Sequence, residues 1–255
     1  MAMALNPMEQ FAVKPLVAEP LFHVAGYPIY FTNEALLMAV VVVVASLFLT
    51  LTVKPGRLVP TRWQSMAETS YEFTANMIHS TTGEDGLKFF PFIFTLFIFV
   101  LFCNFLGMIP GSFTVTSQIA VTVALAAVVI LMVIVVGFYI HGIGFLKLFV
   151  PDVPWYLLIL LVPIEVISFF TRLLSLSVRL FANMLAGHTM LAVFAGFVVA
   201  LGAAGGIFTG LAIAPMLLIV AIYLLELLVA FLQAYVFAIL SCIYLNEALH
   251  LHDQH

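Results

Sequence analysis

Residues 164–200 read IEVISFFTRLLSLSVRLFANMLAGHTMLAVFAGFVVA, and this stretch decides the fold class. It contains no proline, so at 1.5 Å per residue it can form about 54 Å of unbroken helix. Residues 216–250 form a returning arm that can reach roughly 51 Å. Fitting either arm inside a bilayer core of about 30 Å requires a tilt of roughly 55°, beyond the usual range of about 0–40°. Either the arms tilt steeply or their ends project into water, and the low charge of the first arm favours tilt.

The composition of the whole chain also indicates that the protein lies in a lipid bilayer. Of 255 residues, 65% are hydrophobic and 8% are charged, and the mean hydropathy is +1.24. A soluble domain has roughly 25% charged residues and too little interior for this much apolar surface. Soluble enzymes, disordered chains, collagens and disulfide scaffolds are therefore excluded. The formal net charge of −4, without a basic block, also excludes nucleic acid as a partner.

The remaining hydrophobic runs complete the predicted architecture, an all-α polytopic membrane protein that forms a single integral membrane domain over residues 1–255. Residues 1–33 lack the pattern of a signal peptide and are expected to form an outside-facing N-terminal tail on one membrane face. We expect five transmembrane helices, at 34–54, 87–109, 115–141, 154–200 and 211–250. The last two form the long, steeply tilted hairpin. Cys103 and Cys242 lie far apart in apolar runs and are predicted to be packing residues, so neither a metal nor a cofactor is expected.

Residues 61–80 carry a different pattern. Thr61 is the predicted N-cap. Glu68 and Glu72 share one face, and an apolar face recurs at helical spacing through Trp63, Met66, Phe73 and Met77. This pattern favours a helix lying in the membrane interface. A helix in a water-exposed loop is the alternative.

The basic residues predict the orientation. Counted over alternate loops, five of them fall on one side of the membrane and Lys14 on the other: Lys54, Arg57, Arg62, Lys88 and Lys147. The positive-inside rule then places the N-terminus outside and the C-terminus in the cytoplasm.

Arg179 lies near the middle of its arm, too far from either end to reach water easily. A charged side chain at that depth costs at least about 2.5–3.5 kcal/mol, and a guanidinium keeps its proton in a protein. Arg179 therefore needs an anionic partner or a water-filled cavity. Pairing within this chain for folding alone is the alternative.

A polar stripe accompanies Arg179 along the helix. Glu165, Arg172 and Arg179 are spaced seven apart, so they share one face, and Ser168, Thr171, Ser175 and Asn183 lie on or beside it. Such a stripe usually faces a bundle interior or an aqueous path, although each hydroxyl alone also suits ordinary helix packing.

His188 belongs to a different surface, because it follows Arg179 by nine residues and so lies half a turn away. Glu226 and Gln233 share a face of the returning arm. Folding the hairpin about the glycine-rich turn near residue 207 sets His188 opposite Glu226 and Arg179 close to Gln233. The same register sets Glu165 beside Asn246 and Glu247.

Titratable groups on both sides of a permanent charge are what a gated proton path requires. Protons can be relayed from each face, while the arginine repels a proton or cation that would pass directly. Its charge would also drive the proton off a carboxylate on a moving partner.

Three motifs carry a family resemblance. Residues 175–188, SLSVRLFANMLAGH, resemble the signature of subunit a of F-type ATP synthases. Residues 224–240, LLELLVAFLQAYVFAIL, are similar to that family's last membrane segment, and residues 102–111, FCNFLGMIPG, to its earlier helix end. The resemblance covers nearly everything from about residue 31 onward, and the short N-terminal tail resembles the bacterial form.

The resemblance implies the stator half of a rotary proton motor in the bacterial inner membrane, with no catalytic nucleotide site on this chain. The implied partners are a ring of c-subunits, peripheral-stalk b-subunits, the lipid bilayer and protons. Arg179 matches the essential arginine that faces the ring carboxylates. The other implied proton-path residues are Glu165 on the inner side, His188 and Glu226 on the outer side, and Asn183, Gln233, Ser175 and Arg172.

One departure concerns the outer pair, since some family members carry the acid at position 188 and the imidazole at 226. The exchange is expected to preserve function, because both groups titrate.

A secondary ion transporter or antiporter with a membrane-embedded charge site is the alternative. Such transporters usually have inverted repeats and broken helices, and this sequence shows neither. A di-haem cytochrome needs paired deep histidines, and a membrane metalloprotease needs HExxH, which is absent.

Overall fold

The computed structural model confirms an all-α polytopic membrane protein, because five of its helical stretches are long and apolar enough to cross a bilayer. It describes residues 11–17, 22–24, 27–52, 61–109, 112–142, 144–145 and 155–250. Three basic residues used for the orientation, Lys54, Arg57 and Lys147, lie outside these ranges. The chain divides into two compact units, which are described in turn: 1–47, 99–118 and 181–234 in the first, and 48–98, 119–180 and 235–255 in the second.

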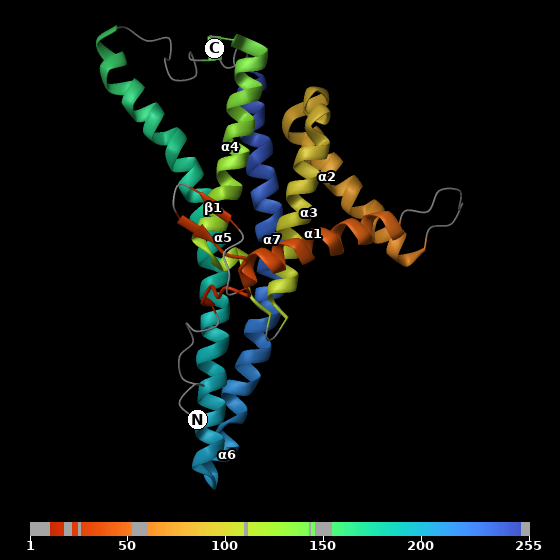
Figure 1. Ribbon diagram of the computed structural model, residues 1–255, viewed down its shortest axis with the longest axis vertical. Helices are drawn as coiled ribbons and strands as arrows, with labels where there is room; N and C mark the ends of the chain where they lie inside the picture. The colour runs from red at the N-terminus through yellow and green to blue at the C-terminus, as the bar shows by residue number, and fades with distance from the viewer. Residues whose placement is uncertain are drawn as a thin grey trace. The chain divides into compact units, whose positions relative to one another are not determined.

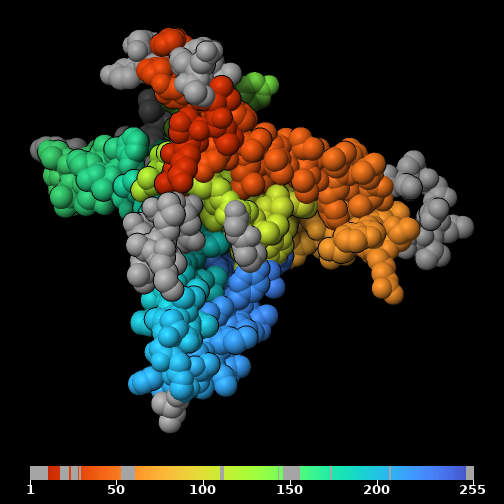
Figure 2. All heavy atoms as spheres, turned by 60° about the horizontal axis from the view of Figure 1, so that its bottom comes forward, coloured from red at the N-terminus to blue at the C-terminus, as the bar shows by residue number. Residues whose placement is uncertain are grey.

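The first unit contains the closed end of the helical hairpin. α5 (Trp155–Ala204) and α7 (Ile213–Leu249) run side by side here, joined by the short α6 (Ile207–Leu211), as Figures 1 and 2 show in cyan and blue. The chain reverses at Gly205 and Gly206, whose φ angles are +70° and +60°. Glycine suits both positions because a Cβ is strained there. The predicted glycine-rich turn is therefore confirmed.

The end of α3 (Phe90–Gly107) packs against this hairpin. Asn104 is fully buried, and its Nδ2 donates to the Ala230 carbonyl at 3.0 Å. Met108, Met184 and Ala230 form a buried apolar cluster beside it. Residues 112–118 follow and include the 3₁₀ turn η4 (Val115–Ser117), which precedes α4 in the chain.

The N-terminal tail is tied to the start of α1 (Asn33–Thr52). Asn33 accepts from the Lys14 amide at 3.0 Å through Oδ1 and donates its own amide to the Lys14 carbonyl at 3.1 Å. Two three-residue strands, β1 (Phe22–Val24) and β2 (Tyr27–Ile29), pair antiparallel in the tail. The apolar pattern of the sequence did not indicate these strands, because hydropathy identifies spanning helices and not a short hairpin.

In the second unit, α2 (Arg62–Gly86) starts at Thr61, whose hydroxyl accepts from the Gln64 amide at 3.3 Å. The predicted N-cap is therefore confirmed. The helix kinks at Gly83, where φ is +71°, and then enters the 3₁₀ turn η3 (Leu87–Phe89). Its buried side includes Gln64, while Trp63 and Met66 are exposed. The apolar face that we traced from Trp63 thus begins on the open side of α2.

The other end of α7 packs against α4 (Ile119–His141) in the second unit, where the two helices lie alongside each other in Figure 1. The second unit has a buried apolar cluster of Val133, Phe145 and Ala248. His141 Nε2 lies 3.2 Å from the Leu249 carbonyl oxygen. Both cysteines, Cys103 in the first unit and Cys242 in this one, are buried free thiols, as expected of packing residues.

Candidate functional site

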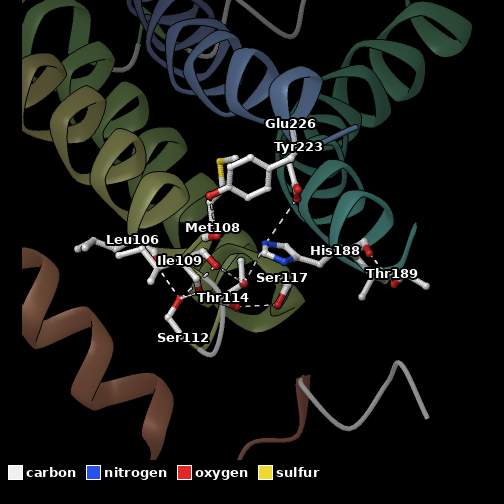
Figure 3. A network of polar contacts seen from close by, with 12 residues as sticks. Leu106, Met108, Ile109, Ser112, Thr114, Ser117, His188, Thr189, Tyr223 and Glu226 are labelled. Atoms are coloured by element: carbon white, nitrogen blue, oxygen red, sulfur yellow. Dashed lines mark hydrogen bonds and ion pairs between the residues drawn. The ribbon is translucent and has the colours of Figure 1, made fainter. Parts of the chain in front are cut away.

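A buried polar cluster, the His188 cluster, joins Thr114, His188 and Glu226 in the first unit (Figure 3). His188 Nε2 lies 3.5 Å from Glu226 Oε1, and their side chains are 13% and 3% exposed. Thr114 Oγ1 lies 3.1 Å from the same nitrogen. The contact between His188 and Glu226 is the one predicted from the hairpin register. Thr114 was not predicted to be in the site.

Two glycines make room for this cluster. A Cβ on Gly187 would lie 2.5 Å from Glu226 Oε1, so the carboxyl group occupies the space that a side chain on α5 would fill. A Cβ on Gly107 would likewise lie 2.9 Å from Thr114 Cγ2. The close approach of α5 to Glu226 of α7 therefore depends on Gly187, and the close approach of α3 to Thr114 depends on Gly107.

Neighbouring polar contacts hold the same elements together. Asn183 Nδ2 donates to Gln233 Oε1 at 2.8 Å, one helical turn from the cluster on α5. Tyr223 donates its hydroxyl to the Met108 carbonyl at 3.3 Å, as Figure 3 shows. Gln233 and Asn183 were both predicted site residues, and the structure pairs them with each other.

Arg179 belongs to the second unit and occupies an open side of α5. Its guanidinium is exposed, and Nη2 lies 3.4 Å from Ser175 Oγ. The adjoining side of the helix is packed: Leu176 and Leu180 are fully buried, and Ser177 Oγ lies 3.1 Å from Thr122 Oγ1 of α4. Among the described residues, no carboxylate lies within ion-pairing distance of Arg179. A fold-stabilising ion pair within the described chain therefore does not explain this residue.

Arg172 differs from Arg179 although both lie on the predicted stripe. It forms an ion pair with Glu247 of α7, and its guanidinium carbon lies 5.6 Å from the centre of the Tyr244 ring. The side chains of Arg172 and Glu247 are 28% and 25% exposed. This guanidinium is thus neutralised within the chain, whereas that of Arg179 is not.

Glu165 lies half-buried on α5. The hairpin register predicted it beside Glu247, but the structure pairs Glu247 with Arg172, seven residues further along α5. A one-to-one register drifts with distance from the turn because packed helices cross at an angle.

The chemistry available in the described residues is proton transfer and charge stabilisation. No group of three His, Cys, Asp or Glu side chains within them could hold a metal ion. Sequence reasoning missed Thr114, Gly107 and Gly187. The only signal for Thr114 was the hydroxyl-rich run Ser112–Ser117 after the end of α3, a run equally typical of a loop.

Comparison with known proteins gives a consistent picture. The family described as ATP synthase A chain matches residues 35–246. ATP synthase subunit a of Mesorhizobium japonicum is 56% identical over 247 residues, which cover 96% of this chain and 97% of that protein. ATP synthase subunit a 1 of Brucella anthropi is 55% identical over 249 residues, covering 97% and 99%. ATP synthase subunit a of Sinorhizobium medicae is 55% identical over 249 residues, covering 97% and 98%.

Proposed function

The chain belongs to the ATP synthase A chain family, and from that premise we propose how its residues conduct protons. Membership makes it a membrane component of F-type ATP synthase with a proton-channel role in the stator, and not a catalytic subunit. In our proposal the His188 cluster lines an outer half-channel, and Glu165, Arg172 and Ser175 line an inner one. Arg179 separates the two half-channels.

The observation that carries this proposal is the opposite burial of two groups on α5. His188 is packed against Glu226 inside the protein, and Arg179 is exposed. A titratable pair held inside the chain suits the transfer of protons. A permanent cation on an open face suits contact with an anion on another molecule.

Unpartnered polar atoms support a hydrated path at the His188 cluster. Among the buried side-chain atoms of the described chain that have no hydrogen-bond partner are Asn104 Oδ1, both carboxylate oxygens of Glu226 and Gln233 Nε2. Buried polar groups nearly always have a partner. Water molecules that carry protons to Glu226 are the partners we propose.

The exposed guanidinium of Arg179 is proposed to face the carboxylates of a c-subunit ring. When a protonated carboxyl group approaches, the arginine favours its ionised form, and the proton leaves through one half-channel. The returning carboxylate is reloaded from the other. Asn183, which is exposed, would contact the passing carboxyl group, and the buried Gln233 would hold the Asn183 amide in place.

The chain is a multi-pass protein of the bacterial inner membrane. We propose that its N-terminus is periplasmic and its C-terminus cytoplasmic, and that peripheral-stalk b-subunits hold it still. Because the chain belongs to this family, the alternative hypothesis of a secondary transporter is rejected.

The test uses the purified complex in lipid vesicles. We expect ATP synthesis to follow an imposed proton gradient, and not a sodium gradient at constant pH. A complex carrying Glu226→Gln is expected to synthesise ATP several-fold more slowly under the same proton gradient. Synthesis driven by sodium alone, or a Glu226→Gln rate equal to that of the unmodified complex, would overturn the proposal.

A further inference from the structure

Thr114 is part of the His188 cluster, and the proton path proposed above assigns no task to its hydroxyl. Its side chain is 4% exposed and comes from the segment between α3 and η4. The backbone here is held in place, because Ser117 donates its hydroxyl to the Thr114 carbonyl at 2.6 Å (Figure 3). The methyl group packs against Gly107, as described above. These contacts therefore hold the Thr114 hydroxyl in a fixed position beside His188.

The hydroxyl has two partners. Its oxygen lies 3.2 Å from the Gly107 carbonyl, to which it can donate, and 3.1 Å from His188 Nε2. A hydroxyl has one hydrogen and two lone pairs, and its hydrogen rotates to suit its partners. It can donate to Gly107 while accepting from a protonated Nε2. When Nε2 has lost its proton, the hydrogen can rotate and donate to that nitrogen.

The nitrogen that Thr114 contacts is also the one that faces Glu226 Oε1, at 3.5 Å. Figure 3 shows the imidazole between the hydroxyl and the carboxyl group. Phe11 of the N-terminal tail lies edge-on to the same imidazole, with ring centres 6.4 Å apart, and its carbonyl accepts from Gln118 Nε2 at 2.8 Å. The His188 imidazole is thus held by the aromatic ring of Phe11 and by the hydroxyl of Thr114.

We propose that Thr114 is a positioning residue of the outer half-channel, holding His188 Nε2 toward Glu226 whether or not that nitrogen carries a proton. This inference rests on the proposed function, since it assumes that the pair relays protons. Without the hydroxyl, Nε2 would be held only in the state in which it donates to Glu226.

Few titratable or charged side chains surround the contact between Thr114 and His188 in the described chain. Glu226 and Tyr223, both from α7, are the other titratable side chains shown around it in Figure 3. Neither α3 nor residues 108–118 contain a charged residue. Arg179 precedes His188 by nine residues on α5, so it points to the other side of that helix.

The experiment compares three variants in the assembled complex. Thr114→Val keeps the shape and removes the hydroxyl, Thr114→Ser keeps the hydroxyl, and Thr116→Val is the matched control. Thr116 is buried in the same segment, and its hydroxyl has no partner among the described residues. The readout is ATP synthesis in vesicles at a fixed proton gradient, with the pH on the outer-side compartment varied.

We expect Thr114→Val to slow synthesis about five- to tenfold at alkaline outer pH, where proton entry limits the rate. The deficit should shrink at acidic outer pH, whereas a fault in assembly would lower the rate equally at every pH. Thr114→Ser and Thr116→Val should stay within about twofold of the unmodified complex.

Two results would overturn the inference: Thr114→Val as fast as the unmodified complex at alkaline pH, or Thr114→Ser as slow as Thr114→Val. Glu226→Gln is measured alongside. If it is impaired while Thr114→Val is not, the inference fails and the proposed function stands. If Glu226→Gln is also unimpaired, the proposed function itself fails.

Discussion

The His188 cluster and the open side of α5 around Arg179 are built from the same helix in opposite ways. At the cluster, three elements converge, glycines allow close approach, and Glu226 is 3% exposed. Around Arg179, the described residues pack against another side of the helix, and Arg179 is exposed. In the function proposed here, the pair that exchanges protons is enclosed by its own chain, and the arginine that meets another molecule is left open.

The difference indicates that the geometry of the His188 cluster depends on the fold of this chain more than the function of Arg179 does. Small changes in packing should disturb the His188 cluster, because its geometry comes from α3, α5 and α7 together. The function of Arg179 should depend on its charge and shape and little on its neighbours. The predictions below test this distinction.

The largest effect is expected at Arg179. Arg179→Lys keeps the charge but loses the planar fork, and a desolvated lysine can give up its proton, so we expect a loss of about a hundredfold or more in coupled ATP synthesis. The measurement is synthesis in vesicles, normalised to assembled complex. Arg172→Lys, at the paired arginine of the same helix, is the control and should cost far less. Equal losses at the two positions would contradict the comparison.

The exchanged pair should show the next largest effect. His188→Glu alone sets two carboxyl groups together, and Glu226→His alone sets two imidazoles together, so each should slow proton pumping about tenfold. The double variant restores one of each and should recover most of that rate. Pumping is compared among the four complexes. A double variant no faster than the product of the two single effects would mean that the residues act independently.

Gly187→Ala tests the packing of the His188 cluster directly. The added Cβ would lie 2.5 Å from Glu226 Oε1, so the carboxyl group must move, and we expect transport to fall roughly fivefold. Gly196→Ala on the same helix is the matched control, because its Cβ would meet nothing within 4 Å. Proton pumping normalised to complex distinguishes them. Similar rates for the two variants would show that the cluster tolerates displacement.

Breaking the Arg172–Glu247 pair should have a smaller effect. Glu247→Gln leaves a second cation without its carboxylate on α5, and we expect passive proton conduction to fall roughly threefold. Exchanging the two charges, with Arg172→Glu and Glu247→Arg together, should restore most of it. Conduction is measured in vesicles stripped of the soluble catalytic sector. If the exchange does not rescue conduction, the pair matters for more than its charge balance.

The smallest effect is expected for Glu165→Gln. Glu165 is half-buried and its route can be bridged by water and neighbouring hydroxyls, so transport should slow by only about twofold. The same pumping assay applies. Complete loss with intact assembly would show that the inner path is narrow and depends on this carboxylate.

The membrane class, the hairpin and the pairing of His188 with Glu226 could all be predicted from the amino-acid sequence. Hydropathy identifies spanning helices because bilayer thickness sets their length, and glycine marks the turn because Gly205 and Gly206 have positive φ. Once the turn is known, helical periodicity sets which nearby residues face each other. These properties are local, or repeat along one helix.

Only the tertiary structure decided which polar residues are enclosed and which are open. Arg172 and Arg179 have the same spacing along the polar stripe, yet Arg172 is paired with Glu247 and Arg179 is not. The difference arises because pairing requires a carboxylate on α7 to lie beside the arginine. Thr114 joined His188 across 74 residues of sequence, in a segment without periodicity. Such contacts come from the packing of separate elements, and a pattern along one element carries no information about them.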